Sequence, residues 1–321
     1  MPATLADRLR SHFGNIAVAT VFLLGLCLAA GAALWWQNEI YRDAEVQFKR
    51  GVEASGSQKV LVLHSYHQGY LWTDMIQEGF SRSLSEQFPK AEIYVEYMNT
   101  KRQTADVMFP HLAKIYKQLY PNVKFDVIVA SDNNALDFLL LHREKLFPGV
   151  PVVFSGINDF FKYRFDPDSN ITGVREDLDI FSTISIALNL HPGTKKVALI
   201  ADGTETGQIN LGLARSVAGK FPGIAFVELN KLTAAQLSDG LKPLKDDTAV
   251  LALSFIRDQA GRTFTARESM DFIVGASPHP VYTVWDFYMA PGAVGGKLLS
   301  GHLQGVGSSL HLTSTRCSQI A

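Results

Sequence analysis

Beyond residue 58, short apolar runs alternate with longer stretches of helical periodicity. The first apolar runs predict buried strands at Val60–His64, Ile93–Tyr97, Asp126–Ala130 and Pro151–Ser155. The stretches between them predict helices over 71–88, 104–120 and 134–146. Continuous apolar strands separated by helices are typical of a parallel sheet with helices on both faces. We therefore expect an α/β fold whose crossovers are right-handed.

A second series of the same kind follows a loop rich in Asp, Asn and Gly at 159–179. Its predicted helices lie at 180–190, 207–221 and 267–275, with a short one from Thr233, where Thr233 and Gln236 have the spacing of a capping box. Its predicted strands lie at 196–201, 225–229, 248–253, 280–285 and 296–300. The two series begin alike, with KVLVLHSYHQG at Lys59 and KVALIADGTETG at Lys196. We predict two similar lobes, lobe one at 58–158 and lobe two at 159–280, with strands at 281–304 returning to lobe one.

The N-terminal region contains an uncharged apolar stretch from Ile16 to Trp36, about 21 residues long. A stretch of roughly 20 apolar residues is long enough to cross the hydrocarbon core of a bilayer. Arg8 and Arg10 precede it, so the positive-inside rule places residues 1–15 in the cytoplasm. We expect a single-pass anchor at 16–36 in a bacterial inner membrane, a linker at 37–57, and a main domain in the periplasm or outside the cell. The alternative is a cleaved signal peptide, because Ala30-Gly31-Ala32 offers a small-x-small cleavage pattern.

The C-terminal segment 305–321 differs from the rest of the chain. It includes VGSSLHLTSTRCSQIA, which lacks helical periodicity and has the Ser/Thr content of a loop. We expect that a frame disruption or a truncation removed the residues that would follow. The alternative is a naturally short protein with a frayed tail.

Composition and the absence of known motifs argue against several classes of function. Lys and Arg total 30 against 31 Asp and Glu, and this balance argues against nucleic acid as a partner. Two cysteines, Cys27 and Cys317, are too few for a disulfide framework or a Cys-rich zinc site. The chain has no G-x-S-x-G elbow, Walker loop or G-x-G-x-x-G motif. His64-x-x-His67 with Asp74 lies at a strand end and does not fix metal geometry, so we expect no metal and no cofactor. We also expect no enzyme. The alternative is an exported hydrolase that uses Ser65 and His64, but neighbouring residues of a strand point to opposite faces.

Polar and aromatic residues gather where the predicted strands end. In open α/β sheets, ligands bind beyond the carboxyl ends of the strands. These ends are His64-Ser65-Tyr66, Ser131-Asp132-Asn133, Ser155-Gly156-Ile157-Asn158, Asp202-Gly203-Thr204, Ser254-Phe255 and Trp285-Asp286. The mixture suits a small polar or amphipathic molecule. The candidate ligand-binding residues are Ser65, Tyr66, Trp72, Ser131, Asp132, Gly156, Asp202, Thr204, Trp285 and Asp286.

Several of these residues have a second interpretation. Ser65, Ser131, Asp132, Asp202 and Thr204 precede predicted helices, where capping explains them equally well. The aromatic side chains are also compatible with a place in the core. Arg175 could pair with a ligand carboxylate, but the neighbouring acids Glu176 and Asp177 offer it internal partners.

An ordered set of segments carries a resemblance to a known family. The segments are LVLHSYHQGYLWTDMIQEGF, VIVASDNNALDFLL, VPVVFSGIND and ITGVRE. Over about 59–304 the chain resembles the ABC-transporter substrate-binding-protein-like family, which has a type I periplasmic-binding-protein fold. That family also occurs as the extracytoplasmic sensor region of bacterial histidine kinases and diguanylate cyclases.

The resemblance implies a hinged, two-lobed clamp that closes around a small molecule. Closure follows from ligand contacts with both lobes, which favour the closed state. With a retained anchor, the resemblance favours a sensor region that lost its output domain. The alternative is a substrate-binding component of an ABC importer. The implied partners are an amino acid, nucleobase or sugar-like ligand, the membrane, and either a second copy of the chain or a permease.

Overall fold

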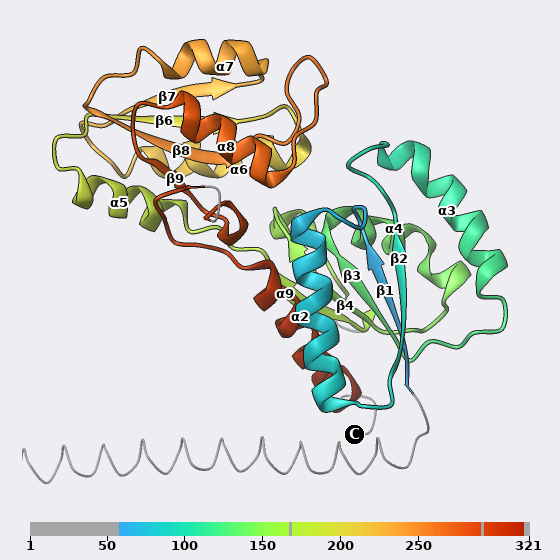
Figure 1. Ribbon diagram of the computed structural model, residues 1–321. Helices are drawn as coiled ribbons and strands as arrows, with labels where there is room; N and C mark the ends of the chain where they lie inside the picture. The colour runs from blue at the N-terminus through green and yellow to red at the C-terminus, as the bar shows by residue number, and fades with distance from the viewer. Residues whose placement is uncertain (1–57, 167–168, 290–291, 318–321) are drawn as a thin grey trace, which may run out of the picture. The chain divides into compact units, whose positions relative to one another are not determined.

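The computed structural model describes residues 58–166, 169–289 and 292–317, with side chains described up to residue 312 (Figure 1). The expected membrane anchor at 16–36 and linker at 37–57 lie outside the described residues. Among the helices that the structure describes, none is both long and apolar enough to cross a bilayer. Residues 57–316 form one compact unit.

Lobe one is built on a five-stranded parallel sheet. Its strands are β1 (Lys59–His64), β2 (Glu92–Tyr97), β3 (Val127–Ser131), β4 (Val152–Ile157) and β5 (Ile171–Arg175), in the order β2-β1-β3-β4-β5. The helices between them are α2 (Leu71–Gln87), α3 (Ala105–Leu119) and α4 (Asp132–Leu146). Strands β3 and β4 are buried throughout. This confirms the α/β alternation that the apolar runs predicted.

Strand β5 extends lobe one beyond its expected boundary at residue 158. The sequence pattern assigned 159–179 to a loop at the start of lobe two, whereas Ile171–Arg175 pairs with β4. The strand lies at the edge of the sheet and its residues are only partly buried or exposed. Gly173 interrupts it, where a Cβ would collide with the backbone of Phe154. A short, glycine-containing edge strand has no continuous apolar run, which is why the pattern missed it.

Lobe two repeats the design with four parallel strands. These are β6 (Lys196–Ala201), β7 (Ala225–Asn230), β8 (Thr248–Ser254) and β9 (Val281–Thr283), in the order β7-β6-β8-β9. Its helices are α5 (Ile180–Leu190), α6 (Glu205–Ala218), α7 (Ala234–Leu241) and α8 (Ala266–Ala276). The Thr233 hydroxyl accepts from the Gln236 N–H and the Gln236 side chain accepts from the Thr233 N–H, which confirms the predicted capping box at α7.

The segment 281–304 does not return to lobe one as strands. β9 pairs with β8 of lobe two, and 296–300 forms no strand. Isolated bridges instead join Tyr282 to Gly295 and Trp285 to Leu299. The buried Trp285 indole donates to the carbonyl of Leu253 at 2.7 Å. These contacts hold the segment on lobe two, together with the one-turn helix η3 (Asp286–Tyr288).

The chain re-enters lobe one as a helix, α9 (Gly301–Cys317), where the sequence pattern predicted a loop from residue 305. Helix α9 packs on α2 (Figure 1). A Cβ on Gly305 would collide with the carbonyl oxygen of Ile76, and one on Gly79 with the carbonyl oxygen of His302. Glycines therefore let the two backbones touch. Because the contact face uses small residues, α9 has no apolar periodicity, and the prediction from that periodicity was wrong.

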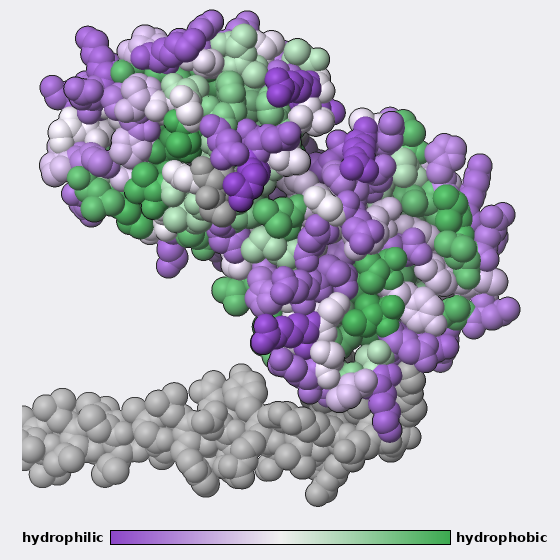
Figure 2. Space-filling model, viewed as in Figure 1, coloured by the Kyte–Doolittle hydropathy of each residue, from purple (hydrophilic) through white to green (hydrophobic). Residues whose placement is uncertain are grey.

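Two apolar clusters form the core, one in each lobe. The cluster of lobe two also takes in Tyr66, Trp72 and Ile76, which belong to the β1–α2 region of lobe one. Hydrophilic residues cover much of the visible surface in Figure 2, with hydrophobic residues in separate groups. The aromatic start of α2 thus packs against lobe two, and it positions the site described next.

Candidate functional site

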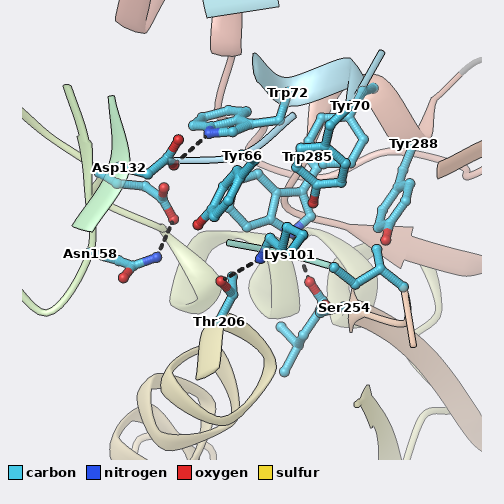
Figure 3. Close-up of a pocket in the computed structure, with 14 residues that line it drawn as sticks. Tyr66, Tyr70, Trp72, Lys101, Asp132, Asn158, Thr206, Ser254, Trp285 and Tyr288 are labelled. Atoms are coloured by element: carbon cyan, nitrogen blue, oxygen red, sulfur yellow. Dashed lines mark hydrogen bonds between the residues drawn. The ribbon is translucent and has the colours of Figure 1, made fainter. Parts of the chain in front are cut away.

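A pocket lies where the two lobes meet, and we call it the inner pocket (Figure 3). Both lobes supply its lining, which is Tyr66, Tyr70, Trp72, Lys101, Asp132, Asn158, Glu176, Thr206, Leu253, Ser254, Ile256, Trp285, Phe287 and Tyr288. The space among these side chains is about 370 Å³ when its part open to solvent is included. That volume is at the lower end of the range of small-molecule sites.

Aromatic rings form the apolar wall of the inner pocket. The Trp72 and Trp285 rings meet edge to face with centroids 5.3 Å apart, and Trp285 stacks on Phe287 at 5.6 Å. Tyr66 meets Tyr70 edge to face at 5.4 Å. Such rings offer flat faces to an apolar or planar group and negative π-faces to a cation.

Asp132 supplies one of the two carboxylates in the lining. It begins α4 with a left-handed backbone (φ 68°), and it accepts hydrogen bonds from the Trp72 indole and the Ser131 hydroxyl, both at 2.9 Å. Burial raises the pKa of Asp132 to about 6. Gly156 leaves room for this carboxylate, because a Cβ there would be 3.0 Å from Asp132 Oδ1 and the backbone φ is 66°.

Glu176 supplies the second carboxylate, directly after β5. Burial is the main cause that raises the pKa of Glu176 to about 8, and the charge of Asp132 adds to it. The Asn158 amide donates to Glu176 at 3.4 Å. At neutral pH the Glu176 carboxyl therefore holds a proton and can donate a hydrogen bond as well as accept one.

Lys101 places a cation inside the inner pocket. Its ammonium lies 4.2 Å from the centroid of the Tyr66 ring and 5.7 Å from that of Tyr70, and it donates to the Thr206 hydroxyl of lobe two at 3.1 Å. Burial lowers the pKa of Lys101, while the carboxylates of Asp202 and Asp132 oppose that change. The ammonium of Lys101 thus bridges the lobes through Thr206 and occupies a cage that would suit a ligand's own cation.

The interior of the inner pocket is nearly filled by its own side chains. Free volume inside amounts to about 30 Å³. This is room for roughly one or two water molecules. A small-molecule ligand therefore does not fit beside these side chains in the arrangement that the structure shows.

Four of the ten candidate residues line the inner pocket, namely Tyr66, Trp72, Asp132 and Trp285. A fifth, Thr204, caps α6 by accepting from the Gly207 N–H at 3.2 Å. Thr204 also lines a neighbouring cavity, which we call the outer pocket. Ligand contact by these residues remains a prediction.

Ser65, Ser131 and Gly156 lie behind the pocket wall rather than in it. The buried Ser65 hydroxyl donates to the Ser131 carbonyl and accepts from the Ala135 N–H, both at 2.7 Å. It therefore holds the start of α4 against β1. The N–H of Gly156 donates to the Gln304 amide oxygen at 3.0 Å, which joins β4 to α9. All three residues support the position of Asp132.

The other two candidates, Asp202 and Asp286, also lie outside the inner lining. Asp202 is buried and accepts hydrogen bonds from Thr204, Ser254 and the Ile256 N–H. Its oxygens organise the loops that end β6 and β8. Asp286 lies in the first turn of η3, where burial raises its pKa.

Sequence reasoning did not select several of the lining residues. Lys101 lies four residues beyond the end of β2, and Glu176 directly follows β5, the strand that the sequence pattern missed, so the rule that ligands lie beyond strand ends selected neither. The sequence offered Glu176 and Asp177 as ion-pair partners of Arg175, and in the structure Arg175 pairs with Asp177 at 3.1 Å. Asn158 and Ser254 stand in the strand ends that the sequence indicated but were not among the ten candidates. The other residues that were not selected are Tyr70, Thr206, Leu253, Ile256, Phe287 and Tyr288.

No group of three or more metal-ligating side chains occurs within the part of the chain that the structure describes. The surroundings of His64 differ from those of a metal-ligating histidine. Its Nε2 lies 2.7 Å from the Gln77 amide oxygen, and its ring stacks on Tyr97. Burial lowers the pKa of His64 to about 4, so the ring is neutral at physiological pH.

Comparison with known proteins found no matching family model and no matching curated protein. Solved structures do match. An ABC domain in complex with L-Trp from Streptococcus pneumonia has a TM-score of 0.59 and 18% identity, covering 82% of this chain and 85% of that one. A ligand-free, open substrate-binding protein with adhesive properties, CD0873 from Clostridium difficile, has a TM-score of 0.56 and 16% identity, covering 81% and 85%.

A periplasmic ribose ABC transporter protein from Conexibacter woesei also matches, with a TM-score of 0.52, 14% identity and coverage of 81% and 86%. These neighbours are binding proteins, not enzymes. At such low identity the likeness establishes the fold, and the fold with its interlobe pocket supports a small-molecule-binding domain. The chain has the type I periplasmic-binding-protein fold.

Proposed function

We propose that the chain is the extracytoplasmic sensor region of a bacterial signal-transduction protein, which binds a small molecule in the inner pocket by closing its two lobes. The observation that carries the binding function is the mixed lining of that pocket. Rings, two buried carboxyls and an ammonium converge there from both lobes. A ligand that contacts both lobes favours their closed arrangement.

The chemistry of the lining narrows the ligand to an amino acid, a nucleobase or a sugar-like molecule. Trp72 and Trp285 provide flat faces, whereas Asp132 and Glu176 accept hydrogen bonds from polar groups. Among the structural neighbours, the Streptococcus protein was solved with L-Trp. A planar ring with a polar or charged group attached is therefore the first class to screen.

A thermal-shift screen of the full-length chain in detergent tests this proposal. A ligand at 100 times its dissociation constant adds about 2.7 kcal/mol to the free energy of unfolding. We expect Asp132→Asn to weaken the binding of a hit at least tenfold. Asp239→Asn is the matched control, because Asp239 lies on α7 in an exposed pair with Lys242. A hit that binds both variants equally well would place the ligand elsewhere.

The sensor role rests on the expected anchor at 16–36 and on the resemblance to sensor regions. The alternative is a substrate-binding component of an ABC importer. The mass of the mature protein recovered from cells discriminates between them. Retention of 16–36 supports the anchored sensor. A mature chain that lacks this segment and co-purifies with a permease would replace the sensor with the importer.

A further inference from the structure

The outer pocket lies beside the inner pocket and has more free space, about 330 Å³ in its interior. Both lobes line it. The residues are His67, Gly69, Tyr70, Leu71, Lys101, Arg102, Thr204, Ile256, Arg257, Thr263, Phe264, Thr265, Ala266, Arg267 and Glu268. Tyr70, Lys101 and Ile256 line both pockets, so the two cavities are neighbours in one cleft.

The lining of the outer pocket carries a large excess of positive charge. Lys101 and Arg102 come from lobe one, and Arg257 and Arg267 come from lobe two. The one acid in the lining, Glu268, is already engaged by the cap of α8. Its Oε2 accepts from the Thr265 N–H at 2.8 Å and from the Thr265 hydroxyl at 3.0 Å.

The structure shows no ion pair to the three arginines among the residues that it describes. Within the described residues, no carboxylate lies within ion-pair distance of Arg102, Arg257 or Arg267. Elsewhere in the same lobes, Arg143 and Arg215 do pair, with Glu144 and Glu228. Converging cations without a counter-charge repel one another, and a bound anion removes that cost.

Asp258, next to Arg257 in sequence, cannot supply the missing charge. Its buried carboxylate accepts from the backbone N–H groups of Ala234, Ala260 and Arg262 at 2.9–3.0 Å. These bonds, with the antiparallel bridge between Arg257 and Thr263, fix the turn that carries Arg257. The guanidinium group is thus presented to the outer pocket from a well-held backbone.

We infer that the outer pocket is an anion-binding subsite for an oxyanion, either a carboxylate or a phosphate group. The guanidinium fork matches the geometry of both groups and can bind them through two parallel hydrogen bonds. An anion held by Arg102 on one side and by Arg257 and Arg267 on the other would link the lobes. The cleft then combines an inner pocket with buried carboxyls and an outer pocket that takes negative charge.

Isothermal titration of the full-length chain in detergent tests the subsite, with inorganic phosphate and malonate as probes and chloride keeping the ionic strength constant. We expect saturable binding of at least one probe. Arg257→Gln and Arg267→Gln should each weaken it at least tenfold. Both side chains are exposed, so the variants should keep the thermal midpoint of the unliganded protein.

Arg82→Gln is the matched control, because Arg82 is an exposed arginine of α2 paired with Glu86. It removes the same charge and should change binding less than twofold. Equal losses in all three variants would show a general charge effect and overturn the proposal, as would the absence of saturable binding of either probe.

The proposals for the outer pocket and for the inner pocket can be tested independently of each other. Asp132→Asn should leave phosphate or malonate binding intact, because Asp132 is not in the outer lining. Competition between the probe and a ligand from the screen would assign the subsite to an anionic group of that ligand. Simultaneous binding would assign it to a separate anion, and either result supports the subsite.

Discussion

The two lobes each bury an aspartate where a central strand ends, but they use it differently. Asp202, after β6, accepts from four donors, and each of its oxygens faces a backbone N–H, that of Thr204 on one side and of Ile256 on the other. Asp132, after β3, accepts from two side chains, the Trp72 indole and the Ser131 hydroxyl. The carboxylate of Asp202 thus uses its hydrogen bonds to hold the loops after β6 and β8 together.

This difference distinguishes a carboxylate that is available to a ligand from one that only stabilises its own loops. The fewer donors around Asp132 do not offset its burial, and its pKa rises to about 6. Asp132 also lines the inner pocket, whereas Asp202 does not. Burial of a carboxylate is thus common to both lobes, and the number of internal donors separates the binding candidate from the structural residue.

The largest effect is expected from Asp202→Asn. An amide group presents an NH₂ where one carboxylate oxygen was, and both oxygens of Asp202 face fixed backbone N–H donors. The NH₂ group of the new amide would then face the backbone N–H of either Thr204 or Ile256, and two donors would oppose each other. We expect a loss of about 4 kcal/mol in the free energy of unfolding, measured by urea denaturation.

Asp132→Asn is the contrasting variant in that measurement. Its amide oxygen can accept from the Trp72 indole, while its NH₂ can donate to the Ser131 hydroxyl, which rotates to accept. We expect a loss below about 1 kcal/mol at pH 5. A loss as large as that of Asp202→Asn would mean that both aspartates are structural.

The next effect is a fall in stability as the pH rises. The pKa values of Asp132, about 6, and Glu176, about 8, lie above the ordinary values that these groups have in the unfolded chain. The unfolded state therefore loses its protons first, and stability present below about pH 4 declines as the pH rises toward 8. The double variant Asp132→Asn/Glu176→Gln should therefore have a larger free energy of unfolding than the wild type at pH 8, because it has no buried carboxyl to ionise at these two positions.

That advantage should vanish by about pH 3, where both carboxyls are largely protonated in either state. Unfolding curves recorded at both pH values provide the measurement. A constant difference between the double variant and the wild type at all pH values would show that these carboxyls do not titrate in the pocket.

A smaller effect is expected from Lys101→Met. The ammonium of Lys101 lowers the pKa of both Asp132 and Glu176. Without it, both pKa values should rise, so a pH titration of tryptophan fluorescence should shift its midpoint to higher pH. Trp72 reports on this change because its indole donates to Asp132. Trp72→Phe should remove the signal, and an unshifted midpoint in Lys101→Met would argue against an ammonium close to the carboxyls.

The smallest effect is expected from Arg175→Ala. Arg175 pairs with Asp177 at 3.1 Å, but both side chains are largely exposed. Exposed pairs contribute little, so we expect a change below about 0.5 kcal/mol in the free energy of unfolding. Ligand binding should also be unchanged, since Arg175 does not line the inner pocket. Loss of affinity in this variant would restore Arg175 as a ligand contact.

The sequence predicted the parts of the fold whose signal is local. Strands such as β3 and β8 are buried throughout and carry continuous apolar runs, and the ends of α5 coincide with the predicted ones. Helix α9 and strand β5 were missed because their burial involves glycine and partly exposed edge positions. Whether these segments form a helix or a strand depends on what they pack against, and hydrophobic periodicity does not report such contacts.

The candidate site was predictable to a similar degree. Tyr66, Trp72 and Asp132 follow strands or lie near the start of helices that the pattern located, so the strand-end rule found them. Trp285 was found because it ended the predicted strand 280–285, although β9 ends at Thr283. The same rule could not separate Asp132 from Asp202, because the number of donors around each carboxylate depends on contacts between distant loops. Lys101 enters the pocket only through its contacts with Tyr66 and Thr206.

The glycines between α2 and α9 have a mechanical consequence. Because the backbones touch at Gly79 and Gly305, neither helix can slide or roll without carrying the other. Trp72 of the inner pocket lies on α2, and a Cβ on Gly301 of α9 would come within 3.0 Å of its ring. A displacement of that tryptophan would therefore act directly on the first turn of α9.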